Sequence, residues 1–277
     1  MFVFDWLLDW LYGKVMEFIQ TFFSYISGMG TEIFELSWIQ AVVEFFRLFG
    51  WAMYVIGLVV AIFDVAIAWQ NGQGDIKSAA LGAIKGFLAV NLFTTVPIEL
   101  YKLTITVQDS LGKAMSGLYG GSLSDLSTMS TAQLTAMSTE VNPFNLFAII
   151  ALGYAVIKVF FANIKRGGIM LTNIAVGSLY IFGLTRGNQD GFIDWTKQVI
   201  ALCVTSFLQN SLLFAGLLTF GDHMLLGLGI MLAANEVPRI ADRFGLDTSA
   251  KVNIMSTYYT AQAAVKTTQA IMKAAAK

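Results

Sequence analysis

The sequence predicts an all-α protein that crosses a membrane several times. Hydrophobic residues make up 56% of the 277 residues and charged residues only 13%, which lies outside the range of soluble globular domains. The mean hydropathy is +0.67. Several apolar stretches also reach the roughly 20 residues that a helix needs to cross a hydrocarbon core about 30 Å thick. The expected fold is a polytopic membrane protein with about five transmembrane helices, an N-terminal amphipathic helix and a cytoplasmic C-terminal helix.

Residues 1–47 are expected to form external amphipathic or interfacial helices. The opening stretch MFVFDWLLDWLYGKV has two aspartates before its first lysine, and this absence of a basic region argues against a cleaved signal peptide. A polar stripe at helical spacing runs through Asp5, Asp9, Gly13, Glu17, Gln20 and Ser24, with Trp, Leu and Phe side chains on the remaining surface. Such a helix rests on lipid headgroups or forms an oligomer contact.

Five apolar stretches are the candidate spans. A transmembrane hairpin over residues 48–101 contains spans 48–69 and 79–101, and residues 143–220 contain spans 144–161, 169–184 and 199–220. The run Met224–Ala234 has only eleven residues and is expected to be re-entrant or interfacial. The predicted count is therefore five spans, and six spans are the alternative.

Five spans place the two chain ends on opposite sides, and the basic residues then suggest an orientation. The turns 70–78 and 162–168 and the C-terminal tail carry the larger share of Lys and Arg. The positive-inside rule therefore predicts a cytoplasmic C-terminus, an external N-terminus and an external segment 102–142. That segment is rich in Ser, Thr and Gly, which suits either a docking or pore-lining element or a flexible connector.

Residues 221–277 combine the short apolar run with a basic tail. The tail carries Lys251, Lys266, Lys273 and Lys277 and no acidic residue after Asp247. An alanine-rich basic helix at this place rests on lipid or docks a cytosolic partner.

Two charged residues interrupt the first two spans. Asp64 and Lys85 lie at similar distances from the turn that joins these spans, so an antiparallel hairpin sets them at similar depth. Ionisable residues inside a membrane usually face a partner or a wet cavity. We expect a charge pair, with Lys158 as a rival partner for Asp64 or as a snorkelling residue. The pair either pins the hairpin or belongs to an ion or proton pathway.

Small and polar residues within the spans predict helix packing. Gly82 and Gly86 form a G-x-x-x-G pattern, and Gln209 and Asn210 lie in the middle of the fifth span. Small residues let helix backbones approach closely, and buried amides form interhelical hydrogen bonds.

The sequence carries no catalytic signature, and we expect that the chain is not an enzyme. The chain has one histidine, His223, and one cysteine, Cys203, so neither a two-histidine metal site nor a disulfide can form within it. Phosphate-binding and nucleophile-elbow motifs are also missing from the sequence. We therefore expect no catalytic residues and no cofactor. The net charge of −1 argues against a chain that wraps nucleic acid.

The chain resembles the TrbL-like polytopic membrane subunits of conjugative type IV secretion systems, in the shorter form carried by conjugative elements of Gram-positive bacteria. The amphipathic N-terminus, the pattern of five spans with a long external segment, and the stretch NEVPRIADRFGLDTS carry the resemblance. The resemblance implies an oligomeric subunit of the translocation channel, in a ring of about five copies. It also implies cytoplasmic ATPases, other secretion subunits and a relaxase with single-stranded DNA as partners.

Two other functions fit the residues alone. An ion-coupled small-molecule transporter could use Asp64, Lys85 and Lys158, although no internal repeat of the kind common in transporters is apparent. A holin-like or structural membrane assembly factor is the third possibility.

Overall fold

The computed structural model describes residues 32–70, 72, 75–118 and 143–244, together with Trp6, Trp10, Gly13, Lys14 and Glu17. Within these residues every regular element is a helix, which confirms the all-α prediction. The elements are η1 (Glu32–Glu35), α2 (Ser37–Gln70), α3 (Ile76–Leu92), α4 (Thr95–Leu118), α6 (Pro143–Thr185), α7 (Asp190–Asp222), α8 (Met224–Ala234) and α9 (Val237–Arg243).

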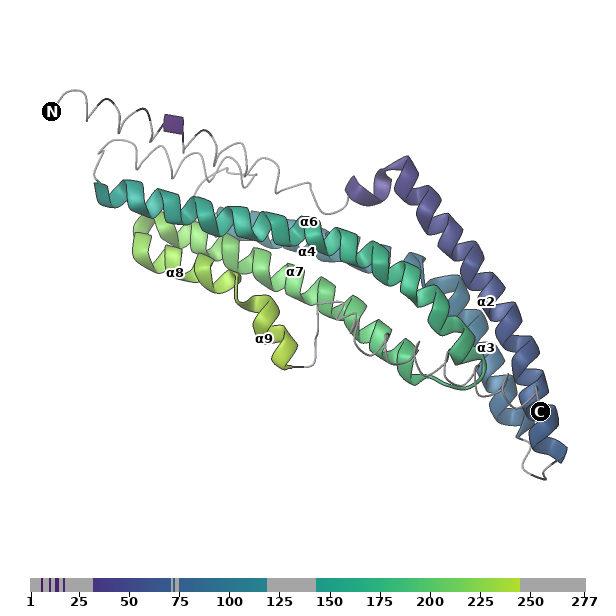
Figure 1. The fold of residues 1–277 in the computed structure, drawn as a ribbon. Helices are drawn as coiled ribbons and strands as arrows, with labels where there is room; N and C mark the ends of the chain where they lie inside the picture. The colour runs from purple at the N-terminus through teal and green to yellow at the C-terminus, as the bar shows by residue number, and fades with distance from the viewer. Residues whose placement is uncertain are drawn as a thin grey trace, which may run out of the picture.

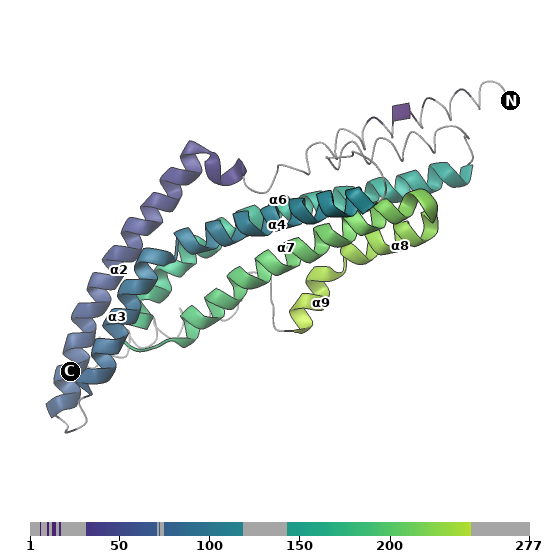
Figure 2. The ribbon, with the colours of Figure 1, turned by 180° about the vertical axis from the view of Figure 1, so that it is seen from behind.

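The helices form a long bundle. Helices α4, α6 and α7 run along its length, with α2 and α3 side by side at one end and α8 and α9 against the other part of α7 (Figures 1 and 2). The α2–α3 turn and the α6–α7 turn lie at the same end of the molecule.

Three helices are long and apolar enough to cross a membrane, namely α2, the Phe147–Thr185 part of α6, and α7. The pair α3 and α4 is bent by 50° and the pair α8 and α9 by 48°, so the count rises to five if each bent pair is one span. The chain is thus a polytopic all-α membrane protein, as predicted.

The prediction of a turn at residues 162–168 between two separate spans is wrong. Residues 143–185 form the single helix α6 of 43 residues. Glycine ends a helix most readily with a positive φ, and among the described glycines only Gly72 and Gly187 have one. Gly167 and Gly168 therefore continue the helix, and α7 supplies partners for the polar side chains beside them.

The predicted span over residues 79–101 coincides with the bent pair α3 and α4, which pass as one span only together. Helix α3 ends at Leu92 and α4 begins at Thr95. Pro97 explains the break, because it has no N–H to donate to the Phe93 carbonyl and its ring clashes with that carbonyl in a continuous helix. The structure places the close-packed Phe93 and Thr94 at the bend, both nearly fully buried.

Two predicted segment boundaries also change. Helix α4 extends to Leu118, so the segment predicted as a loop from residue 102 begins as a helix. Helix α2 begins at Ser37, so residues 37–47 are continuous with the first long helix. Most of the predicted N-terminal amphipathic helix, residues 119–142 and the tail lysines Lys251, Lys266, Lys273 and Lys277 lie outside the described residues.

The buried apolar side chains form two clusters along the bundle. The first core joins η1, α2, α3, α4, the C-terminal half of α6 and the N-terminal half of α7. Its members are Phe34, Ile39, Val90, Phe93, Tyr101, Met170, Ile174, Ile181, Trp195, Val199, Leu202 and Cys203. The second core joins the other halves of α6 and α7 with α8. Its members are Ala148, Ile149, Leu152, Ala155, Val156, Val159, Phe160, Leu213, Leu217, Phe220, Leu228, Met231 and Ala234.

Candidate functional site

A buried polar cluster lies between the two cores. It consists of Gln108 on α4, Asn163 and Arg166 on α6, and Gln209 and Asn210 on α7. Arg166 is 4% exposed, Gln209 2%, Asn210 3% and Gln108 7%. On α6 and α7 these positions fall between the residues of the first core and those of the second, so the cluster marks the boundary of two apolar regions.

The cluster is one connected chain of hydrogen bonds across three helices. The Arg166 guanidinium donates to the Gln209 side-chain oxygen and, at 2.8 Å, to the Asn163 side-chain oxygen. Asn163 donates to Asn210 at 2.9 Å, and Asn210 donates to Gln108 at 2.8 Å. Each amide oxygen accepts one bond. Connected networks of this kind rigidify a packed interior and select one arrangement of its helices.

Arg166 is a buried cation held by neutral oxygens. Among the described residues, no carboxylate lies within ion-pairing distance of its guanidinium. An ionisable residue inside a membrane bundle is expensive and is by default a candidate functional residue. Because arginine keeps its proton in proteins, Arg166 offers a fixed positive charge and not an acid or base. The chemistry available here is therefore binding and helix positioning.

Asp64 pairs with Arg186 and not with Lys85 or Lys158. Arg186 Nε donates to Asp64 Oδ2 at 2.8 Å, and Nη2 lies at the same distance from that oxygen. The predicted hairpin geometry considered only the first two spans. The α6–α7 turn lies beside the α2–α3 hairpin and carries Arg186. The planar guanidinium of arginine matches the geometry of a carboxylate.

The two lysines lie elsewhere. Lys85 is half-buried and lines a groove between α3 and α7. Lys158 is exposed on α6, with its ammonium 5.7 Å from the centre of the Tyr154 ring. No ion pair joins either lysine to the described part of the chain.

Gly82 and Gly86 lie where α3 approaches the end of α6. A Cβ atom at Gly82 would be 2.7 Å from the Thr185 carbonyl oxygen, and one at Gly86 would be 2.6 Å from the Thr185 hydroxyl. The G-x-x-x-G pattern thus packs two helices of the same chain, in the way small residues commonly do.

Sequence reasoning singled out Gln209 and Asn210 but missed Arg166, Asn163 and Gln108. Asn163 and Arg166 fell in a segment assigned to a turn, and Gln108 fell in one assigned to a loop. The available signal was the spacing of Asn163 and Arg166, which places both on one helix face. Among the described residues, no group of three or more His, Cys, Asp or Glu could hold a metal ion.

A bundle of long apolar helices tied by buried amides and an arginine defines a polytopic helical membrane protein. A family model described as conjugal transfer protein TrbL matches residues 1–276. The chain therefore belongs to the TrbL family of conjugal transfer proteins, and it takes part in conjugal transfer by type IV secretion as a membrane component. No curated protein and no solved structure matches the chain.

Proposed function

We propose that this chain is an oligomeric subunit of the translocation channel in a conjugative type IV secretion system of the cytoplasmic membrane. Its substrate would be a relaxase bound to single-stranded DNA, or a protein. Cytoplasmic ATPases would supply the energy, and the chain itself would carry out no chemistry. Family membership supports the link to conjugal transfer, and the length of α6 supports the oligomeric channel.

Helix α6 is longer than a bilayer is thick. Its 43 residues extend about 65 Å at 1.5 Å per residue, whereas the hydrocarbon core measures about 30 Å. Even a tilt of about 40° leaves a projection of about 50 Å. Both halves of α6 are apolar and both pack in a core. Part of one core therefore extends beyond the lipid and requires a protein cover.

The second core carries the exposed apolar surface that needs this cover. Its flanking side chains Phe147, Ile150, Leu225 and Leu226 are all at least half exposed. A hydrophobic surface of this kind outside lipid marks a protein interface. Copies of the same chain are the simplest cover, because closed rings bury one patch in every copy.

In the proposed oligomer, the polar path for the substrate lies between copies of the chain. Inside the described bundle, the polar groups of Arg166, Gln209 and Asn210 are used by one another and by their neighbours. A single bundle therefore offers little free polar lining for a charged substrate. A path between copies, or between this chain and other subunits, leaves the network in place.

The proposed orientation puts the α2–α3 and α6–α7 turns in the cytoplasm. Lys77, Lys85 and Arg186 lie near these turns, and the positive-inside rule favours this end for the cytoplasm. A cysteine in place of Gly72, in a Cys203→Ala background, should react with an impermeant maleimide only after the cells are opened. Labelling of intact cells would reverse the orientation.

Cross-linking in living cells tests the oligomer. Because Cys203 is the only cysteine, the Cys203→Ala chain accepts single reporters. Phe147→Cys, at the second core, should give a cross-linked dimer and higher species with a bifunctional maleimide. Ile62→Cys on α2 is a matched control, since Ile62 is 68% and Phe147 65% exposed. Equal cross-linking at both positions would indicate random collision and contradict the proposed interface.

Transfer assays test the channel role. Deletion of the chain should abolish DNA transfer to a recipient, and expression in trans should restore it. Cells in which Phe147→Cys is cross-linked should still contain the relaxase and its nicked DNA but fail to deliver them. Normal transfer without the chain would contradict the proposal.

A further inference from the structure

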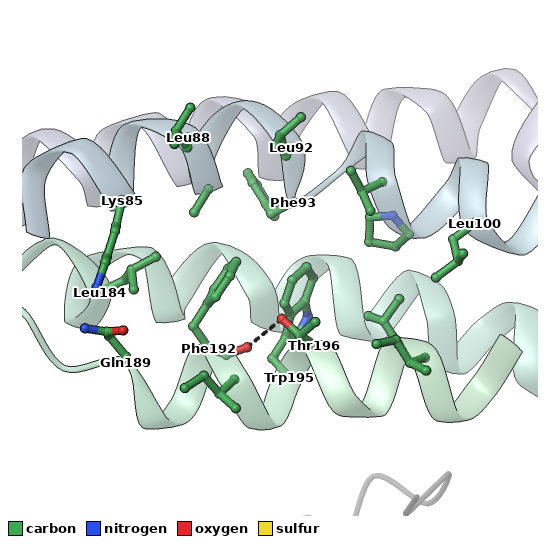
Figure 3. Close-up of a pocket in the computed structure, with 16 residues that line it drawn as sticks. Lys85, Leu88, Leu92, Phe93, Leu100, Leu184, Gln189, Phe192, Trp195 and Thr196 are labelled. Carbon is green, nitrogen blue, oxygen red and sulfur yellow. Dashed lines mark hydrogen bonds between the residues drawn. The ribbon is translucent and has the colours of Figure 1, made fainter. Parts of the chain in front are cut away.

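An apolar groove of about 480 Å³ lies between α3, α4 and the start of α7. Its walls are aliphatic and aromatic side chains, among them Leu88, Leu92, Phe93, Phe192 and Trp195 (Figure 3). The volume falls in the range of about 300–1,000 Å³ that is typical of ligand pockets.

The bend at Pro97 opens this groove. Because α4 turns away from the axis of α3 by 50°, the two helices cannot both lie flat against α7. Pro97 and Phe93 line the resulting space. The rim residues Leu88 and Leu92 are about half exposed. The groove is therefore open to the side of the bundle, where lipid surrounds a membrane protein.

One end of the groove carries polar groups. Lys85 extends from α3 toward Gln189, and both side chains lie beside Leu184 (Figure 3). Within the described part of the chain, neither the Lys85 ammonium nor the Gln189 carboxamide makes a hydrogen bond or ion pair with a side chain. The hydroxyl of Thr196, by contrast, already donates to the Phe192 carbonyl at 2.9 Å.

Acidic side chains do not neutralise this end. Asp190 and Asp194 are exposed and form no part of the groove lining. Asp194 pairs with Lys197 at 3.0 Å. The nearby Asp64 carboxylate accepts from Arg186. Lys85 is thus a cation at the mouth of an apolar groove, with donor capacity to spare.

We propose that the groove binds an anionic phospholipid, with its phosphate at Lys85 and Gln189 and an acyl chain along α3, α4 and α7. The length fits one leaflet. From Lys85 to Leu100 the lining extends about 20 Å at 1.5 Å per residue, and one leaflet with its headgroups measures about half of 40–45 Å. An ammonium favours a phosphate as a point charge.

The charge favours a lipid over a second copy of the chain. An apolar helix packed in the groove would bury the Lys85 ammonium without a counter-charge, which is costly. An anionic lipid supplies that counter-charge together with the apolar tail. This inference is independent of the proposed channel, since a lipid site forms on one copy.

Binding of phosphatidylglycerol and phosphatidylcholine to the purified full chain tests the site. Native mass spectrometry should show tighter binding of phosphatidylglycerol. Lys85→Gln should weaken that binding about tenfold, because a charge-assisted hydrogen bond to phosphate is lost. It should also reduce the preference over phosphatidylcholine, whose phosphate is already neutralised by its choline cation. Lys158→Gln is the matched control, since Lys158 is an exposed lysine outside the groove. Its phosphatidylglycerol binding should equal that of the wild type.

Phosphatidylglycerol with a photoreactive acyl chain locates the site on the wild-type chain, so this measurement does not depend on whether a variant folds. Cross-links should map to peptides of α3, α4 and the start of α7, and Val96→Trp, which fills the groove, should reduce them. Cross-links confined to other helices would overturn the proposal. So would equal losses in Lys85→Gln and Lys158→Gln, or displacement of the lipid by a peptide from a second copy.

Discussion

The two cores of this chain differ in the number of helices that surround them. In the first core, six elements surround the buried side chains, and charged residues mark the ends of apolar stretches. On α2 the stretch between Arg47 and Asp64 is free of charges and extends about 25 Å, close to the thickness of a hydrocarbon core. The second core has only parts of α6, α7 and α8.

This difference in the number of surrounding helices leaves different surfaces exposed. The first core has the dimensions of a membrane segment and exposes a continuous apolar face on α2. The second core is surrounded by fewer helices. The backbones of α7 and α8 approach closely there, with Gly216 facing Gly227. This core leaves Phe147 and Leu225 exposed, and the proposed oligomer would cover them. The hydrogen bonds of the Arg166 cluster join α4, α6 and α7 between the two cores.

The largest expected effect comes from the α7–α8 contact. A Cβ atom at Gly227 would overlap the Phe220 backbone and lie 2.6 Å from the Gly216 carbonyl oxygen. Backbone atoms cannot yield as a flexible side chain does. Gly227→Ala should therefore lower the free energy of unfolding by about 3 kcal/mol, measured by denaturant unfolding in micelles.

Gly229 is the matched control on the same helix. A Cβ atom there would meet nothing within 4 Å. Gly229→Ala should raise stability by up to about 1 kcal/mol through helix propensity. The opposite signs separate packing from propensity, and a stable Gly227→Ala chain would show that α8 does not pack on α7 in this way.

The next largest effect concerns the polar cluster. Arg166→Leu leaves the buried Gln209 oxygen and the partly buried Asn163 oxygen without their donor, and this should cost about 2 kcal/mol. Removing the stranded acceptor as well, in Arg166→Leu with Gln209→Leu, should recover part of the loss. The exposed neighbour Lys165 gives the control Lys165→Leu, which should change stability little. A double variant less stable than the single one would argue against the bond.

Residue 166 also shows how far sequence reasoning reaches. Composition and helical period predicted an all-α membrane protein and located most apolar stretches. They placed a turn at residues 162–168, because asparagine, lysine and arginine side chains are costly in lipid without partners and two glycines follow them. The helix continues because Gln209 and Asn210, more than forty positions later in the chain, form hydrogen bonds with these polar side chains. Single-chain periodicity carries no such long-range pairing.

A smaller effect is expected where α3 meets α6 in the first core. Gly82→Ala and Gly86→Ala should each cost about 1–2 kcal/mol. The two should differ in rescue. The atom opposing Gly86 is the Thr185 hydroxyl at 2.6 Å, whereas the atom opposing Gly82 is the Thr185 carbonyl oxygen at 2.7 Å. Adding Thr185→Ala should restore stability to Gly86→Ala only. Rescue of both would mean that the backbones lie farther apart.

The smallest effect concerns Asp64. Its side chain is 48% exposed and that of Arg186 40%, so solvent or headgroups screen the pair and its coupling should stay below about 1 kcal/mol. A double-mutant cycle with Asp64→Asn and Arg186→Gln should still resolve the coupling, because Nε and Nη2 of Arg186 both lie 2.8 Å from one carboxylate oxygen.

The same cycle with Lys85 distinguishes the two possible partners of Asp64. Asp64→Asn and Lys85→Gln should be additive within about 0.5 kcal/mol, as for residues without a shared contact. Coupling to Lys85 instead of Arg186 would return the pair to the α2–α3 hairpin that the sequence predicts. It would also remove the unpaired cation from the groove. Additivity leaves Lys85 available for a phosphate, and it makes Asp64 the residue that joins the α2–α3 hairpin to the α6–α7 turn at the end of the first core.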